Sequence, residues 1–252
     1  MFKRDSMMKI LLSNDDGYKA DGIKILEKSL ANYGDIIVGA PKNNNSACSS
    51  SLSVHSKVEV KKINNTHYII NGTSADCVNI VSRGIMKKLP DIVISGINYG
   101  SNMGDDVIYS GTVAAAIEGR FCKYSPIAVS ITSRNPKHTK DINKKIDLIL
   151  DFMLKKPNKS RNIFNINIPD IPYSKIKGIR FTILGGRAIS KRAKITTIQN
   201  KTYATIGAVG KDIISSKRTD FNAIKSNFIS ITPLTINMCD NKLLNKLRKR
   251  NA

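Results

Sequence analysis

The 252-residue sequence contains no tryptophan, and aromatic residues make up only 6% of it. Its four cysteines are scattered without a CxxC pair and its three histidines lie far apart, so neither set has the spacing of a zinc site. The cysteines are therefore interpreted as reduced residues. No apolar run is long enough to cross a membrane, and the first residues lack the apolar core of a signal peptide. These absences argue against a zinc domain and a membrane protein, and we expect a cytoplasmic location.

Acidic residues are scarce and unevenly placed. The chain holds 41 Lys and Arg against 19 Asp and Glu, a net charge of +22, and residues 127–252 account for +19 of it. Such a charge attracts anionic partners such as nucleotides, polyphosphate or nucleic acid. Because the basic residues are dispersed and lack interleaved aromatics, a solvated surface is the favoured interpretation, and nucleic-acid binding stays open as the less favoured one.

Strand and helix patterns alternate through the first 170 residues, and apolar residues, 41% of the chain, suffice for a core. Strands are expected over residues 8–13, 35–41, 91–96, 126–132 and 162–169. Helices are expected over residues 21–34, 74–89, 110–121 and 141–156. Gly34 is expected to end the first of these helices, and Ser74 is expected to cap the N-terminus of the second. Helices between successive strands imply right-handed crossovers, so the sequence predicts an α/β fold with a doubly wound, mainly parallel sheet.

The pattern changes after residue 170. Further strands are expected on both sides of Asn200–Lys201 and over 228–234, and the chain ends in a short basic helix or tail. We therefore expect a disordered extension over residues 1–7, a core domain with the functional site over 8–170, and a β-hairpin with a C-terminal extension over 171–252 that takes part in oligomerisation.

Three polar segments directly follow expected strands. They are SNDDG (13–17), APKNNNS (40–46) and the glycine-rich SGINYGSNMGDDVIYSGT (95–112). In a parallel sheet the carboxyl ends of the strands form the edge at which ligands bind. The sequence therefore predicts one site at which these three segments meet.

Asp15, Asp16, Ser46 and Asn98 are the oxygen donors that these segments would bring together. Two carboxylates with hydroxyl and amide oxygens suit Mg²⁺ or Mn²⁺ better than zinc. A bound dication would also let two adjacent aspartates stay ionised. From SNDDG alone, the favoured alternative is that both aspartates only cap the following turn.

The segment 95–112 runs directly into an alanine-rich helix. Free backbone N–H groups and the hydroxyls of Ser110 and Thr112 then stand at a helix N-terminus, where phosphate is favoured. The segment fits neither GxxxxGK[ST] nor GxGxxG, so a structural Ω-loop with a hydroxyl cap remains an alternative.

Five segments of the chain resemble, in order, the motifs of the SurE family of metal-dependent 5'-nucleotidases, also called survival-protein phosphatases: ILLSNDDG, APKNNNSACSSSLS, NGTSADCV, SGINYGSNMGDDVIYSGTVAAAIEG and TDFNAIKSNFISITPL. The resemblance implies a Rossmann-like core with a β-rich C-terminal extension that exchanges between subunits of a homodimer or homotetramer. It also implies hydrolysis of nucleoside 5'-monophosphates, with 3'-nucleotides and short polyphosphate as further substrates, using one Mg²⁺ or Mn²⁺ per subunit.

The resemblance also implies roles for individual residues. The metal ligands would be Asp15, Asp16, Ser46 and Asn98, with Asp15 and Asp16 also catalytic, and the phosphate pocket would be lined by Asn102, Ser110, Gly111 and Thr112. The chain departs from the family at Ala47, usually Gly, at Ser74, usually Pro, and at Ser13, usually Thr. None of these changes removes a ligand, although Ala47 alters the loop that presents Ser46.

The sequence thus predicts a phosphomonoesterase in which water attacks phosphorus with the help of a divalent cation. A covalent phosphoenzyme is not indicated, since the DxDx[TV] arrangement of haloacid-dehalogenase-type phosphatases is absent. The alternative function is a non-catalytic basic module for nucleic acid or polyphosphate, which would bind with steep salt dependence and no metal requirement.

Overall fold

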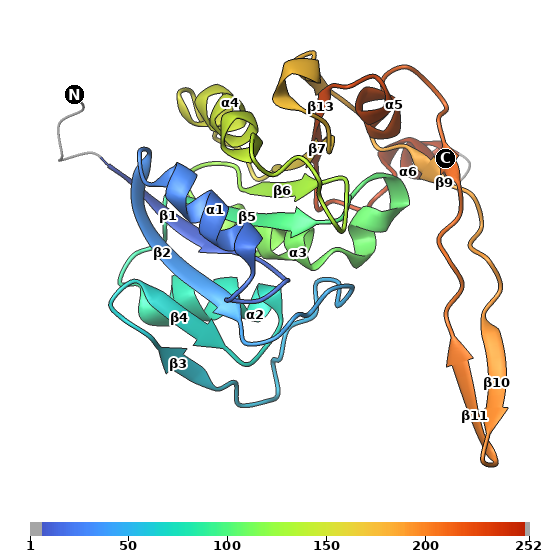
Figure 1. The fold of residues 1–252 in the computed structure, drawn as a ribbon, viewed down its shortest axis with the longest axis horizontal. Coiled ribbons are helices and arrows are strands. Elements are labelled where there is room, and N and C mark those ends of the chain that lie inside the picture. Colours follow the sequence, from blue (N-terminus) through green and yellow to red (C-terminus); the bar gives the residue numbers. More distant parts are fainter. Residues whose placement is uncertain (1–6, 250–252) are drawn as a thin grey trace.

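A nine-stranded sheet forms the centre of the computed structural model, which describes residues 7–249 (Figure 1). The strand order is β3-β4-β2-β1-β5-β6-β7-β13-β8. The strands are β1 Met8–Ser13, β2 Gly34–Pro41, β3 Val60–Lys62, β4 His67–Ile70, β5 Ile92–Tyr99, β6 Ile127–Ile131, β7 Ile163–Ile168, β8 Ile179–Phe181 and β13 Ile229–Leu234. The expected disordered extension over residues 1–7 lies outside the described residues except for Met7.

The sheet is mainly parallel, as predicted. The six adjacent strands β4, β2, β1, β5, β6 and β7 run parallel to one another, whereas β3 and β13 pair antiparallel with β4 and β7. From β1 the chain builds the sheet outward through β2 and β4, then returns to β5 on the other side of β1. The order therefore reverses at β1, which is where open α/β sheets bind ligands.

Helices cover both faces of this sheet (Figure 1). Helices α1 (Asp21–Leu30) and α4 (Ile142–Leu154) contact each other on one face, and α2 (Ser74–Ile80) and α3 (Gly111–Glu118) on the other. Alternate residues of β1 pack against the helices on opposite faces of the sheet. Ile10 and Leu12 pack in the cluster that includes α1 and α4, and Leu11 packs in the cluster that includes α2 and α3.

The helix expected over 74–89 is shorter and is capped one residue earlier. The Thr73 hydroxyl accepts the Asp76 backbone N–H while the Asp76 carboxylate accepts the Thr73 N–H, which makes a capping box and makes the predicted Ser74 cap wrong. A π-helical turn, Val81–Ile85, then ends this helical segment.

Gly34 starts β2 instead of ending the helix expected over 21–34. The helix α1 stops at Leu30 with Ala31 as its C-cap. A Cβ on Gly34 would lie 2.0 Å from the Met8 carbonyl oxygen, so close strand pairing, not helix capping, requires glycine there.

The sheet continues past the predicted domain boundary at residue 170, because β8 and β13 both belong to it. Between them a hairpin of β10 (Lys194–Ile198) and β11 (Lys201–Thr205) extends away from the body (Figure 1). Its two turn residues, Gln199 and Asn200, have φ of 47° and 60°, as a type I′ hairpin requires. Strands flank the turn as predicted, although the turn lies one residue earlier than the expected Asn200–Lys201, because Lys201 already begins β11.

Short elements complete this part of the chain. Strands β9 (Gly186–Arg187) and β12 (Asp212–Ile213) pair at the base of the hairpin, α5 (Asp220–Lys225) precedes β13, and α6 (Asn241–Arg248) is the expected basic helix. None of the helices within residues 7–249 is long and apolar enough to span a membrane.

Candidate active site

The predicted site lies at the carboxyl end of β1, where the strand order reverses. Asp15 and Asp16 follow β1, and Asn98 lies near the end of the adjacent strand β5. The loop after β2 is fixed to the same place, because the Asn45 backbone N–H donates to the Asp15 carbonyl oxygen at 2.8 Å. The three segments predicted to meet therefore do meet at one edge of the sheet.

Asp15 is buried, with 3% of its surface exposed. The Thr112 hydroxyl donates to its Oδ1 at 2.6 Å, and Gly111 packs so closely that a Cβ there would lie 2.7 Å from the Asp15 Cβ. Burial raises the pKa of Asp15 to about 6, with a further rise from the charge of Asp16 and an opposing effect of the Thr112 hydrogen bond. Among the described residues, the hydrogen bonds to this carboxylate therefore come from neutral donors.

Asp16 and Asn98 are oriented by the backbone around the end of β5. Burial raises the pKa of Asp16, and a backbone hydrogen bond from Tyr99 opposes this rise. The Asn98 Nδ2 donates to the Gly100 carbonyl oxygen at 2.7 Å. This bond fixes the Asn98 amide and leaves its Oδ1 as the atom that can act as a ligand.

Ser46 lies on the exposed surface of the loop after β2, one residue beyond the contact with Asp15. Its N–H and its hydroxyl both donate to the Asn44 Oδ1, at 2.8 and 2.6 Å, so the hydroxyl oxygen keeps its lone pairs for another partner. The next residue, Ala47, has a φ of 62°. Glycine adopts this conformation without the steric cost that alanine carries, which is a physical reason for the glycine that the family usually has at this position.

The phosphate-binding candidates form and support the first turn of α3. The Ser110 hydroxyl accepts the Val113 N–H at 3.1 Å as the N-cap, and Gly111 and Thr112 begin the helix. Asn102 differs from the expectation of a lining residue, because its Nδ2 points into the protein and donates to the Ser130 hydroxyl at 2.8 Å. Its contact with phosphate stays a prediction.

The sequence analysis missed two supporting residues on β7. Asn165 and Asn167 are fully buried, and each donates its Nδ2 to the Asn102 carbonyl oxygen, at 2.8 and 2.9 Å. The Asn167 Oδ1 also accepts the Asn102 N–H at 2.9 Å. Two asparagines at alternate positions of an apolar strand, NINI, were the available signal, because buried amides need partners on one face.

Two further residues fix the glycine-rich segment to the C-terminal part of the chain. The buried Asp220 carboxylate accepts the N–H groups of Gly104 and Gly185, at 2.8 and 2.9 Å. Arg187, at the base of the hairpin, donates its backbone N–H to Asp105 at 2.6 Å and its Nε to Asp106 at 2.9 Å. The loop next to the site is thus held by residues more than 80 positions away in the sequence.

The donor set suits a hard divalent cation. No Lys, Arg or His within the described residues forms an ion pair with Asp15 or Asp16, although both carboxylates are desolvated. A cation would compensate this charge. Residues 7–249 contain no cluster of three or more His, Cys, Asp or Glu that could hold a metal ion, so hydroxyl and amide oxygens would have to complete the coordination, as Mg²⁺ and Mn²⁺ accept.

Known proteins are similar to this chain in sequence and in fold. The chain matches the family model described as "Survival protein SurE" over residues 10–191. It is 44% identical over 232 residues to the 5'-nucleotidase SurE of Histophilus somni (strain 2336), covering 92% of this chain and 94% of that protein. It is 40% identical over 243 residues to the 5'-nucleotidase SurE of Pseudoalteromonas atlantica, covering 96% and 98%.

Among solved structures, the SurE protein from Aquifex aeolicus matches with a TM-score of 0.83 and 34% identity, over 96% of this chain and 99% of that one. The family match covers the segment from β1 to the base of the hairpin, and so includes all eight predicted site residues. With its sheet order, its desolvated aspartate pair and these relatives, the chain belongs to the SurE family.

Proposed function

We propose that this protein is a 5'-nucleotidase that hydrolyses nucleoside 5'-monophosphates to a nucleoside and inorganic phosphate. The observation that carries this proposal is the desolvated, uncompensated pair of Asp15 and Asp16 beside the N-terminus of α3. The names of the relatives, 5'-nucleotidase SurE, support the same reaction. Other substrates of the class, 3'-nucleotides and short polyphosphate, are part of the proposal.

We further propose that Asp15, Asp16, Asn98 and Ser46 hold one Mg²⁺ or Mn²⁺ per subunit. When bound, such a cation polarises a phosphoryl oxygen and lowers the pKa of a coordinated water. In the hydrolysis, the oxygen of a water molecule bonds to phosphorus as the bond from phosphorus to the 5'-oxygen breaks, and the proton that this water releases balances the proton that the 5'-oxygen of the leaving nucleoside takes up.

The residues of the chain have distinct parts in this reaction. One of the two aspartates accepts the proton of the attacking water. Asp15 is held for that role by the Thr112 hydroxyl and by contact with Gly111. The Ser110 hydroxyl, which accepts the Val113 N–H as the N-cap, keeps its own proton to donate to the phosphate, and the positive end of the α3 dipole stabilises the negative charge that develops there.

The test is phosphate release from AMP with Mn²⁺, with Mg²⁺ and with EDTA, for the wild type and for Asp16→Asn. We expect release only with metal and a loss of at least about a hundredfold in the variant, because a metal contributes several kcal/mol at the transition state. Asp35→Asn, an exposed acid on β2, is the control and should keep full activity. Release that persists in EDTA, or an Asp16→Asn variant as active as wild type, would refute the proposal.

We also propose that the protein forms a homodimer or homotetramer through the hairpin and α6. Both elements belong to the segment 171–252, which the sequence analysis expects to take part in oligomerisation. Exposed apolar side chains on these elements support it: Ile195, Ile198, Tyr203, Leu243 and Leu247. Light scattering should give a mass of at least twice that of one chain, which is 27.8 kDa, and a variant without the hairpin should have the mass of a single chain.

We further propose a cytoplasmic location, which the four unpaired cysteines support.

A further inference from the structure

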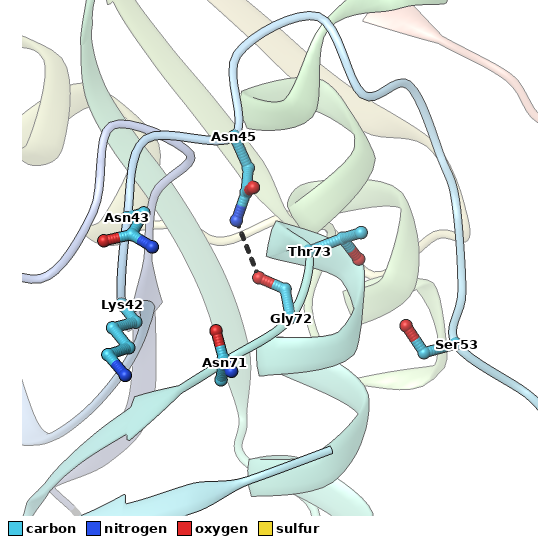
Figure 2. A pocket seen from close by; sticks show the side chains of 7 residues that line it. All are labelled: Lys42, Asn43, Asn45, Ser53, Asn71, Gly72 and Thr73. Atoms are coloured by element: carbon cyan, nitrogen blue, oxygen red, sulfur yellow. Dashed lines mark hydrogen bonds between the residues drawn. The ribbon is translucent and has the colours of Figure 1, made fainter. Parts of the chain in front are cut away.

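A polar pocket of about 170 Å³ opens beside the loop that carries Ser46 (Figure 2). Its lining residues are Lys42, Asn43, Asn45, Ser53, Asn71, Gly72 and Thr73. They come from the loop after β2 and from the turn between β4 and α2, and none of them is aromatic or acidic.

The pocket lies close to the proposed reaction centre. Asn45 connects the two. Its Nδ2 donates to the Gly72 carbonyl oxygen at 2.7 Å, as Figure 2 shows, and its backbone N–H donates to the Asp15 carbonyl oxygen at 2.8 Å. Strand β2 lies between β1 and β4 in the sheet, and neighbouring strands are about 5 Å apart. The pocket at the ends of β2 and β4 is therefore one to two strand spacings from the end of β1, within reach of a nucleoside whose phosphate lies at Asp15 and Asp16.

Several lining side chains are fully occupied in holding the pocket together. Ser53 donates its N–H and its hydroxyl to the two Asp76 carboxylate oxygens, both at 2.8 Å. Thr73 caps α2 and donates its hydroxyl to the Ser51 carbonyl oxygen at 2.7 Å. Together with Asn45 these residues form a fixed wall.

Three other lining side chains have no such duty. The amides of Asn43 and Asn71 make no side-chain hydrogen bond to the described part of the chain, and both are exposed. Within residues 7–249, the Lys42 side chain makes one ion pair, at 3.9 Å with Glu59; both side chains are well exposed, so the pair contributes little. These three are available to a ligand.

We propose that this pocket binds the nucleoside of the substrate, with Asn43 and Asn71 as its hydrogen-bonding groups; this rests on the proposed function. Amides both donate and accept, so they match ribose hydroxyls and the edges of bases. The absence of acidic groups from the lining spares a phosphate-bearing ligand from repulsion. Without aromatic residues, recognition here depends on hydrogen bonds and not on stacking.

The test compares a substrate with a nucleoside and one without. For Asn43→Ala/Asn71→Ala we expect kcat/KM for AMP to fall about tenfold, mainly through KM, because two hydrogen bonds to neutral groups are lost. Turnover of p-nitrophenyl phosphate should stay within about twofold of wild type, since this substrate does not reach the pocket. The matched control, Asn65→Ala/Asn162→Ala, removes two exposed amides elsewhere and should leave both substrates unaffected.

An unchanged kcat/KM for AMP, or an equal fall for both substrates, would overturn the assignment. Failure of the proposed function gives a different result, in which the wild type with metal releases phosphate from neither substrate. The pocket is then tested by calorimetric binding of adenosine, which contains the nucleoside alone. Weaker binding by the double variant supports the pocket, and equal binding by wild type and variant overturns it.

Discussion

Replacing Gly111 with alanine should disable the site while leaving the fold intact. Gly111 has no positive φ, so its backbone accepts alanine, and alanine is the better residue inside a helix such as α3. The added Cβ would, however, lie 2.7 Å from the Asp15 Cβ and 2.9 Å from its Oδ2. Ordinary van der Waals contact starts at 3.4 Å, so one of the two segments must shift by about 0.5 to 0.7 Å.

The shift has different consequences for stability and for rate. Overpacking of this kind costs about 1–3 kcal/mol, part of which the helix propensity of alanine offsets. A displacement approaching 1 Å at a reacting group can cost about a hundredfold in rate. We therefore expect kcat/KM for AMP to fall between about tenfold and a hundredfold, with a loss of stability below about 2 kcal/mol.

Steady-state kinetics and urea unfolding of the same preparation measure both quantities. Gly84→Ala is the matched control, because a Cβ at that position meets nothing within 4 Å, and it should leave activity unchanged. If Gly111→Ala hydrolysed AMP as fast as wild type, the contact between α3 and Asp15 would not be what positions the carboxylate, and our account of the site would be wrong.

Three further predictions concern the support of the site and the thiols. Asn167→Ala should lower stability by about 2 kcal/mol in urea unfolding, because it leaves a buried N–H of the glycine-rich loop without its acceptor; unchanged stability would contradict this. Arg187→Ala should increase amide hydrogen exchange at the base of the hairpin and around the glycine-rich loop, and equal exchange in both proteins would show that the ion pairs do not couple them. Ellman's reagent at pH 8 should react rapidly with the exposed Cys48 and Cys239. It should react slowly with Cys122, because burial and the charge of Asp91 raise the pKa of this thiol to about 12, and a third fast thiol would refute this.

Local sequence signals located the elements of the core well. Apolar runs and helical spacing predicted β1, β6, β7 and α4 to within two residues at each end, because each pattern reports which side of an element is buried. The two helix-end predictions failed for different reasons, one through contact with a second segment and one through a competing cap in the same segment. At Gly34 it was the approach of the Met8 carbonyl oxygen, and at Ser74 it was the reciprocal bond between Thr73 and Asp76.

The carboxyl ends of parallel strands share an edge, so the order of elements alone predicted that Asp15, Asp16 and Asn98 would lie together. The supports beneath them could not be predicted in the same way. Asn165, Asn167, Asp220 and Arg187 each bond to the glycine-rich segment across more than 60 residues of sequence. The NINI pattern of β7 indicates buried amides that need partners, but it does not indicate which distant segment supplies those partners.

The sequence by itself determined the fold class and the family, because periodicity and motif spacing act within a few tens of residues, and it supplied the residues that we propose for a cation. Only the tertiary structure decided that Asp15 is desolvated beside Gly111, that the Asn102 amide points inward, and that the Asn43 and Asn71 amides make no hydrogen bond to residues 7–249. Burial and hydrogen-bond partnership depend on what the rest of the chain places around a side chain. These quantities set the charge, position and availability of each group, and therefore what the site can bind.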